Sequence, residues 1–273
     1  MSLSILNNIP ALEAENQLNI TTAAANKSLQ ELSSGSRINS GSDDAAGLAI
    51  SDGLNANVAA LNQSSLNATN AVGALQTADG ALSQITSLLN RSVTLATEAS
   101  SSGLSTAQSA AINTEFQALL TQIGNIGSST NFNGTAVFSA TAISAFTSDG
   151  TSGGTVSIAA TPGTLSTTTL GLNASVLTSA TAAQTALTAI TAAVSTVSAL
   201  RGTLGATVEQ LQAASTVDTN ESQNLVTASS NITSADISSV VADDTKYSIL
   251  QQTGISALQQ ANQQAQTILK LLQ

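Results

Sequence analysis

The chain has 273 residues, of which 42% are hydrophobic and only 2% aromatic, and its 16 acidic and 6 basic residues give a formal net charge of −10. It contains no Cys and no His, so the commonest general base, the usual metal ligands and every thiol nucleophile are missing, which disfavours an enzyme, a metal site and a cofactor site. The negative charge disfavours nucleic acid and anionic membranes as partners, and the absence of a run of about 18 apolar residues argues against a membrane span.

The first predicted element is a helix over residues 10–33. Its apolar positions recur at helical spacing and include Leu18, Leu29 and Leu32. Proline suits the first turn of a helix and disrupts its interior, so we expect the helix to begin near Pro10 or to kink there.

A linker is predicted at 34–43, where Ser and Gly run into two adjacent carboxylates. Adjacent residues at a helix start do not face each other, so a catalytic carboxylate pair is a poor interpretation. A helix cap is the better interpretation. Ser42 or Asp43 would accept hydrogen bonds from first-turn amides, and Asp44 would complement the positive end of the helix dipole.

Two long helices are predicted, at 44–99 and within 181–235, because apolar residues recur there every seven positions. Asp79 and Arg201 each occupy a position in a largely apolar column. If the helices run antiparallel, with the start of one opposite the end of the other, Asp79 falls opposite Arg201. We therefore predict that the two residues pair and fix the register. The alternative is that either side chain reaches solvent or meets a different subunit.

Between the long helices, a shorter helix is expected at 105–127, and the Asn-Gly pair in "NFNG" predicts a tight hairpin turn. Residues 139–180 are rich in Ser, Thr, Gly and Ala and are expected to form short strands and loops at a tip. A last helix at 236–273 contains Gly254, which costs about 1 kcal/mol relative to Ala in a helix interior. Close approach of a packed helix would explain it. The near-palindromic order places both termini at one end of a rod.

The repeated apolar residues form a predicted assembly seam, in which one helix face meets a partner helix. Its members are Leu18, Leu29, Leu32, Leu54, Leu61, Leu75, Leu82, Leu89, Ile190, Val197, Leu204, Leu211, Leu225, Ile232, Tyr247, Leu258, Ala261, Ile268 and Leu272.

Four segments in order resemble the terminal regions of bacterial flagellins: "LSSGSRINSGSDDAAGLAIS", "NFNG", "ALRGTLGA" and "ILQQTGISALQQANQQAQTILKLLQ". The resemblance covers roughly residues 1–138 and 181–273, and the segment between them is shorter than in the large flagellins. It implies a mainly α fold, a long antiparallel coiled-coil helical hairpin or bundle with a small β-hairpin and a loop tip.

The resemblance also implies that different segments of the chain occupy different places in the filament. Residues 1–33 and 236–273 would form inner-tube helices, 34–43 a linker, and 44–138 with 181–235 an outer-tube rod, leaving 139–180 as a short solvent-facing tip. The implied function is that of a structural subunit that assembles into the flagellar filament, the propeller of swimming motility. Implied partners are identical subunits, a flagellar export chaperone, and cap and hook-associated proteins. The subunit would be extracellular and exported without a cleaved signal peptide.

Two alternatives are weighed against this function. A hook-filament junction protein of the same family would share both termini but occupy only a few copies. A secreted coiled-coil adhesin or receptor ligand would have ordered termini in dilute solution and would form no filament.

The stretch "LLNRSVTLATEA" resembles the flagellin segment that the vertebrate innate immune receptor recognises. Leu89, Arg91 and Leu95 agree with that pattern. Val93 and Thr94 stand where a second Arg and a Glu are typical, so we expect weak recognition because two charged contacts are lost.

Overall fold

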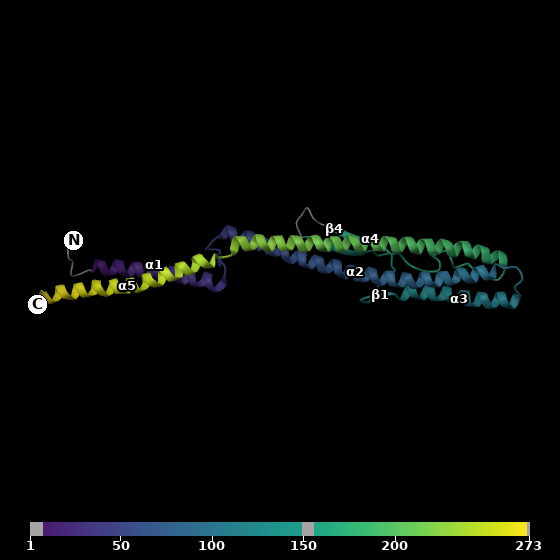
Figure 1. The fold of residues 1–273 in the computed structure, drawn as a ribbon, viewed down its shortest axis with the longest axis horizontal. Coiled ribbons are helices and arrows are strands. Elements are labelled where there is room, and N and C mark those ends of the chain that lie inside the picture. The colour runs from purple at the N-terminus through teal and green to yellow at the C-terminus, as the bar shows by residue number, and fades with distance from the viewer. Residues whose placement is uncertain (1–7, 149–155, 272–273) are drawn as a thin grey trace. The chain divides into compact units, whose positions relative to one another are not determined.

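The structure, a computed structural model, describes residues 8–148 and 156–271 and is mainly α-helical (Figure 1). The helices are α1 (Ile9–Ser34), α2 (Ala45–Ala99), α3 (Thr106–Ser129), α4 (Ala180–Thr233) and α5 (Ile237–Leu271). The strands are β1 (Asn131–Phe132), β2 (Thr135–Ala136), β3 (Ile143–Thr147) and β4 (Val156–Ala160), which form two antiparallel ribbons, β1–β2 and β3–β4. The predicted mainly α fold with a small β-hairpin is confirmed.

The chain divides into two compact units. The terminal unit consists of Met1–Ala56 and Leu225–Gln273, and the central unit consists of Asn57–Asn224. Both boundaries fall inside the continuous helices α2 and α4. The division into inner tube, linker and outer tube that the resemblance implies follows helix ends instead, and it stays a prediction.

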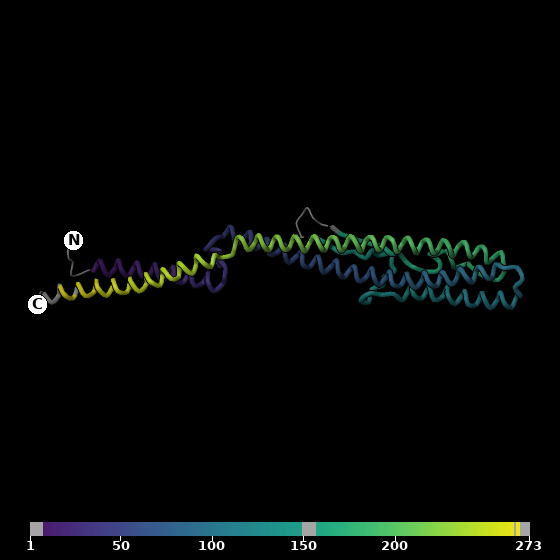
Figure 2. The backbone as a smooth tube through the Cα atoms, in the orientation of Figure 1, coloured from purple at the N-terminus to yellow at the C-terminus, as the bar shows by residue number. Residues whose placement is uncertain are grey.

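In the terminal unit, α1 and α5 lie side by side and run antiparallel (Figure 2). The Asn8 side chain accepts a hydrogen bond from Ala11 N and donates one to the Ala261 carbonyl of α5, at 3.3 and 3.2 Å. Pro10 lies in the first turn, where its missing N–H costs nothing, so the helix begins there and does not kink.

Gly254 of α5 lies against Leu18 of α1. A Cβ added to Gly254 would lie 3.3 Å from Leu18 Cδ1, tighter than an ordinary contact. The predicted reason for this glycine, close approach of a packed helix, therefore applies within one chain.

The core of the central unit is built from α2, α3 and α4. It includes Phe116 of α3, which is fully buried. The loop at 161–179 packs along α3: the Gln117 side-chain amide donates to the Ser175 carbonyl at 2.9 Å, and Leu177 N donates to Asn113 Oδ1 at 2.8 Å. The loop buries Leu165, Leu170, Leu172 and Leu177 in this core.

The predicted hairpin turn has a clear backbone signature. Asn133 and Gly134 both have positive φ, 50° and 78°, as the tight two-residue turn between β1 and β2 requires. The second ribbon pairs Ile143 with Ala160 and Phe146 with Ser157, which gives the strands expected after residue 139. The middle of the predicted tip, residues 149–155, lies outside the described residues.

Among the helices in the described ranges, α4 alone combines the length and the hydropathy needed to cross a membrane. The criterion rests on length and composition, and Ala and Val supply much of the hydropathy. Ile190, Val197 and Leu204 of this helix are buried in the core of the central unit, which is the ordinary reason for an apolar helix in a folded protein.

Candidate functional site

Nine of the nineteen residues of the predicted assembly seam are buried inside one chain, and a contact of the others with a second copy stays a prediction. Its buried members are Leu61, Leu75, Leu82, Leu89, Ile190, Val197, Leu204, Leu211 and Ala261. Those that are half-buried are Leu18, Leu32, Leu54, Leu225, Ile232, Tyr247 and Leu258, whereas Leu29 is 50% exposed. The Ile268 side chain and Leu272 lie outside the described part. A heptad column marks a face that meets another helix but does not say which chain that helix belongs to. The buried members are therefore unavailable to a second copy.

Large apolar side chains that stay exposed are concentrated on the terminal unit. Those on α1 include Leu12, which is 66% exposed. Among the described residues of this unit, the exposed set is Ile9, Leu12, Ile20, Leu29, Ile50, Val226, Ile237, Val241, Ile249, Leu250 and Ile255. Scattered apolar residues are normal on a protein surface, but nine of these eleven lie on α1 and α5, which makes this helix pair the candidate interaction surface.

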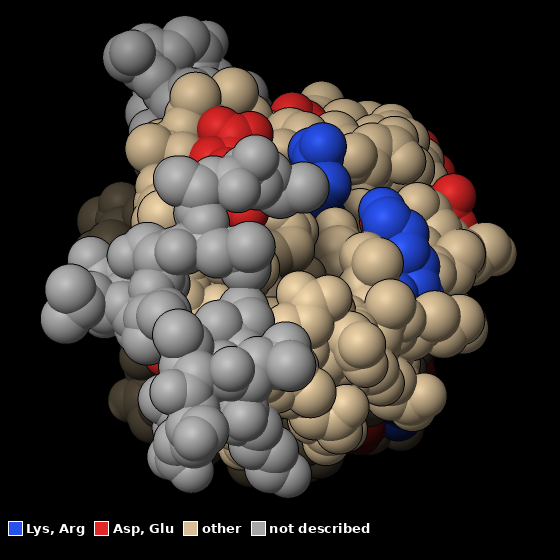
Figure 3. Space-filling view, turned by 90° about the vertical axis from the view of Figure 1, so that its left-hand side faces the viewer, with Lys and Arg blue, Asp and Glu red and all other residues tan. Residues whose placement is uncertain are grey.

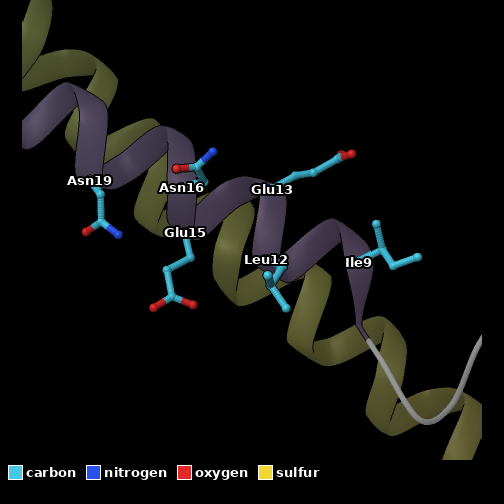
Figure 4. Close-up of a pocket in the computed structure, with 6 residues that line it drawn as sticks. All are labelled: Ile9, Leu12, Glu13, Glu15, Asn16 and Asn19. Atoms are coloured by element: carbon cyan, nitrogen blue, oxygen red, sulfur yellow. The ribbon is translucent and has the colours of Figure 1, made fainter.

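The outer face of α1 shows how these residues are presented. Ile9, Leu12, Glu13, Glu15, Asn16 and Asn19 line a hollow of about 690 Å³, and all six project from α1 (Figure 4). In the space-filling view, charged side chains are scattered over a mainly uncharged surface (Figure 3). Two of the six residues are carboxylates, Glu13 and Glu15, so a partner that covers this face would have to leave them hydrated or supply charge partners.

The contact between α1 and α5 buries few side chains. Within the described residues, the buried ones are Thr21, Ala25 and Ser28 of α1 and Val240 and Ala261 of α5. At about 25 cal/mol per Å² of buried apolar area, small side chains of this kind stabilise a helix pair only weakly. The pair therefore leaves more large apolar side chains exposed than it buries between its own helices.

The start of α2 is capped by Asp44, not by Ser42 or Asp43. Gly47 N donates to Asp44 Oδ1 at 2.9 Å, and Leu48 N donates to the Asp44 carbonyl at 3.0 Å. The cap lies one residue later than Asp43 because α2 begins at Ala45. The Ser42 hydroxyl bonds only to the Ser40 hydroxyl in this stretch, at 2.7 Å.

Asp43 forms hydrogen bonds within the linker and an ion pair with α1. Its Oδ2 accepts from Asn39 N, Ser40 N and Ser40 Oγ at 3.2, 3.1 and 3.0 Å, and Lys27 Nζ lies 3.0 Å from its Oδ1. The hydrogen bond from Lys27, followed by those from Asn39 and Ser40, lowers the pKa of Asp43 from 3.8 to about 2. The same bond raises the pKa of Lys27.

The contribution of Asp43 to linker stability depends on pH in a defined direction. A carboxyl group whose pKa is depressed in the folded chain stabilises it above the ordinary pKa of 3.8, and this stabilisation is lost as the pH falls through about 2. Lys27 and Glu31 of α1 are the other titratable groups at this site. We expect amide exchange in residues 36–44 to be slower in the wild type than in Asp43→Asn at pH 5, with the difference disappearing toward pH 2. An unchanged difference at pH 2 would contradict the assignment.

Asp79 and Arg201 lie together on α2 and α4, as their columns predict. Arg201 Nε donates to Asp79 Oδ1 at 2.7 Å and Nη2 donates to Oδ2 at 3.3 Å, and Asp79 raises the pKa of Arg201. Their side chains are 45% and 37% exposed, so solvent screens the pair. That the pair sets the register of the two helices stays a prediction.

We expect Asp79→Asn to lower the free energy of unfolding by about 1 kcal/mol or less, because exposed pairs contribute little. Glu98→Gln, at an exposed acidic residue of the same helix, should leave it unchanged. Urea unfolding followed by circular dichroism measures both variants. A loss of several kcal/mol for Asp79→Asn would mean that the pair acts through more than its own attraction.

Near the start of α2 and the end of α4, polar side chains meet between the two helices in place of apolar ones. In the central unit, Ser64 Oγ donates to buried Asp218, Ser65 and Ser215 share a hydrogen bond of 2.7 Å, and Ser222 Oγ donates to Asn62 Oδ1. Ser148 N donates to Ser64 Oγ at 3.1 Å and so connects the end of β3 to the helix pair. Asp218 stood in an otherwise apolar column, and its heptad position was the signal that could have identified this contact.

The residues of the receptor-like stretch belong to the central unit. Leu89 and Leu95 are buried in its core. Arg91 is exposed and forms an ion pair with Glu115 of α3, with Nη2 to Oε1 at 2.6 Å. Weak receptor recognition stays a prediction.

No group of three or more His, Cys, Asp or Glu side chains within 8–148 and 156–271 is arranged to hold a metal ion. Sequence reasoning missed Lys27 and Arg37. The Arg37 guanidinium donates to the Ile232 carbonyl at 3.0 Å, where a cation complements the C-terminal end of α4. Both residues are among only six cations in the chain, and that scarcity was the available signal.

Comparison with known proteins identifies the family. Sequence profiles of the bacterial flagellin N-terminal and C-terminal helical regions match residues 5–143 and 187–272. A flagellin of Halalkalibacterium halodurans is 36% identical over 269 residues, covering 98% of this chain and 99% of its own. A flagellin of Listeria monocytogenes is 31% identical over 290 residues, covering 99% of each chain. The flagellar filament 30.7 kDa core protein of Treponema maltophilum is 31% identical over 282 residues, covering 98% of this chain and 99% of its own. Because these matches extend over nearly the whole chain, it belongs to the bacterial flagellin family and is a structural subunit of the flagellar filament.

Proposed function

We propose that copies of this chain polymerise outside the cell through the exposed apolar residues of their terminal units. The observation that carries the proposal is the contrast between the two helix pairs. The heptad positions of α2 and α4 in the central unit are buried within the chain, whereas α1 and α5 expose side chains such as Leu12 and Ile255. Burying one such side chain contributes about 1.5–3 kcal/mol, and each copy carries several.

Self-assembly then couples ordering to burial. Fixing the backbone of a residue costs about 1–2 kcal/mol, and the weak contact between α1 and α5 offsets little of that cost. Burial against neighbouring copies, which cover the exposed face of α1, would offset the rest of this entropic cost. The terminal helices would therefore become ordered as the subunit joins the polymer. This mechanism requires no catalytic group, and the subunit acts mechanically, as a member of a structural family, rather than as an enzyme.

The proposed partners follow from the route of a filament subunit. Identical copies are the principal partners. An export chaperone would cover the apolar terminal helices before export, and cap and hook-associated proteins would meet the same helices at the ends of the filament. The absence of His and Cys fits this mechanical function.

The direct experiment adds purified chain to short seeds sheared from wild-type filaments. We expect long filaments in negatively stained micrographs and a defined critical concentration by sedimentation. A junction protein would bind seed ends without extending them. An adhesin would stay monomeric and would resist proteolysis at both termini in dilute solution, which would overturn the proposal.

A further inference from the structure

Four helix ends meet in one small region of the terminal unit. Residues 35–44 connect α1 to α2, and residues 234–236 connect α4 to α5. The two connections pair through the backbone: Arg37 N donates to the Thr233 carbonyl at 2.7 Å, Ala235 N donates to the Gly35 carbonyl at 3.0 Å, and Ser36 bridges to Ser234. The connections are thus hydrogen-bonded to each other rather than left as independent loops.

Each helix end in this region also has its own partner. Gly35, with φ of 69°, donates to the Glu31 carbonyl and ends α1, and Asp44 caps α2. The Arg37 guanidinium bonds to the end of α4 through the Ile232 carbonyl. Asp236 Oδ1 accepts from Ser238 N at 3.0 Å and caps α5. Buried Ile38 fills the space beside Gly47. Backbone groups that are satisfied in this way hold a connection in one conformation.

One ion pair joins α1 to this region from the side. Lys27 Nζ lies 3.0 Å from Asp43 Oδ1, although the two residues are separated by the whole last part of α1 and most of the linker. The hydrogen bonds from Asn39 and Ser40 hold the other carboxylate oxygen, so the linker itself orients Asp43 toward Lys27. A pre-oriented carboxylate makes a charge-assisted hydrogen bond directional.

We infer that residues 35–44 and 234–236 form a clasp that positions α1 against α5 for assembly, with the Lys27–Asp43 pair as its latch. The inference rests on the proposed function, because the effect of the latch is measured as a change in polymerisation. The contact between α1 and α5 buries few side chains, so it does not by itself fix the direction in which α1 leaves the linker. Lys27 and Asp43 are positioning residues: they lie apart from the exposed apolar face and act by directing it.

The test compares the latch with an ordinary surface pair of the same unit. Lys246 and Asp243 of α5 lie 3.3 Å apart within one helix, so this pair does not join two segments of the chain. The full-length variants are Asp43→Asn, Lys27→Met and their double variant, matched by Asp243→Asn, Lys246→Met and their double variant. Asn keeps an acceptor for Asn39 N and Ser40 N, and Met keeps the length of the Lys stem, so each change removes the charge and the bond between the two side chains while retaining most of the shape.

Critical concentration is measured by sedimentation on wild-type seeds. Each latch variant should raise it about fivefold, the double variant should raise it no more than either single, and the Asp243 and Lys246 variants should leave it unchanged. In the assembled polymer, amide exchange at Arg37 and Ala235 should accelerate in the latch variants. Wild-type critical concentrations in the latch variants, or effects that simply add in the double variant, would overturn the latch. Failure of the wild type to extend its own seeds would instead overturn the proposed polymerisation.

Discussion

Replacing Leu12 with Asp should strongly impair filament growth while leaving the central unit folded. Leu12 lies on the outer face of α1, 66% exposed, beside Ile9 and Asn16. Within a polymer the substitution removes about 1.5–3 kcal/mol of apolar burial and adds the cost of desolvating a carboxylate. We expect the critical concentration to rise at least about tenfold. Sedimentation on wild-type seeds measures it, with circular dichroism to show that the helices of the central unit persist.

Leu12→Met is the matched control for this prediction. It keeps an apolar side chain of similar volume at the same position and should assemble at the wild-type concentration. Growth of Leu12→Asp at the wild-type concentration would show that the outer face of α1 stays in solvent in the filament. The proposed surface would then be wrong, even though the chain is a flagellin.

Gly127→Ala should be the most destabilising single-methyl change in the central unit. A Cβ at this position would overlap the carbonyl oxygen of Leu165, which is backbone and cannot rotate away. Relief requires moving the 161–179 loop off α3 and opening the cluster around its buried leucines, so we expect a loss of about 1–3 kcal/mol of unfolding free energy.

Gly124→Ala, three residues earlier on α3, separates packing from helix propensity. Nothing lies within 4 Å of a Cβ added there, so the change should leave packing intact and raise stability by up to about 1 kcal/mol. Urea unfolding of the two full-length variants should thus give shifts of opposite sign. A neutral or stabilising Gly127→Ala would show that the loop leaves α3 in solution.

Periodicity and turn chemistry predicted most of the helical architecture. The heptad columns located α2 and α4, and the Asn133–Gly134 pair located the first hairpin. Antiparallel counting along the two columns places Asp79 opposite Arg201, and the two side chains form an ion pair. These signals are local or repetitive, so a single sequence contains them.

The features that the sequence did not predict are contacts between segments, and these depend on which surfaces meet in the folded chain. A column of Leu and Ile is the same whether its partner helix belongs to the same chain or to another, so nine of the nineteen residues predicted for the assembly seam are buried within one chain. The path of the 161–179 loop along α3 has no periodic signal, because Asn113 and Gly127 recognise its backbone rather than its side chains. Asp43 and Asp44 are chemically identical neighbours, and only the position of the helix start gives one the cap and the other Lys27.

The chain has no Trp and a single Tyr, Tyr247, which lies half-buried on α5 with Lys246 Nζ 5.0 Å from the centre of its ring. Ultraviolet emission excited in the tyrosine band therefore originates in the terminal unit alone. A change in its intensity during polymerisation would report the fate of α5 without any attached dye, and the central unit would contribute no background to that signal.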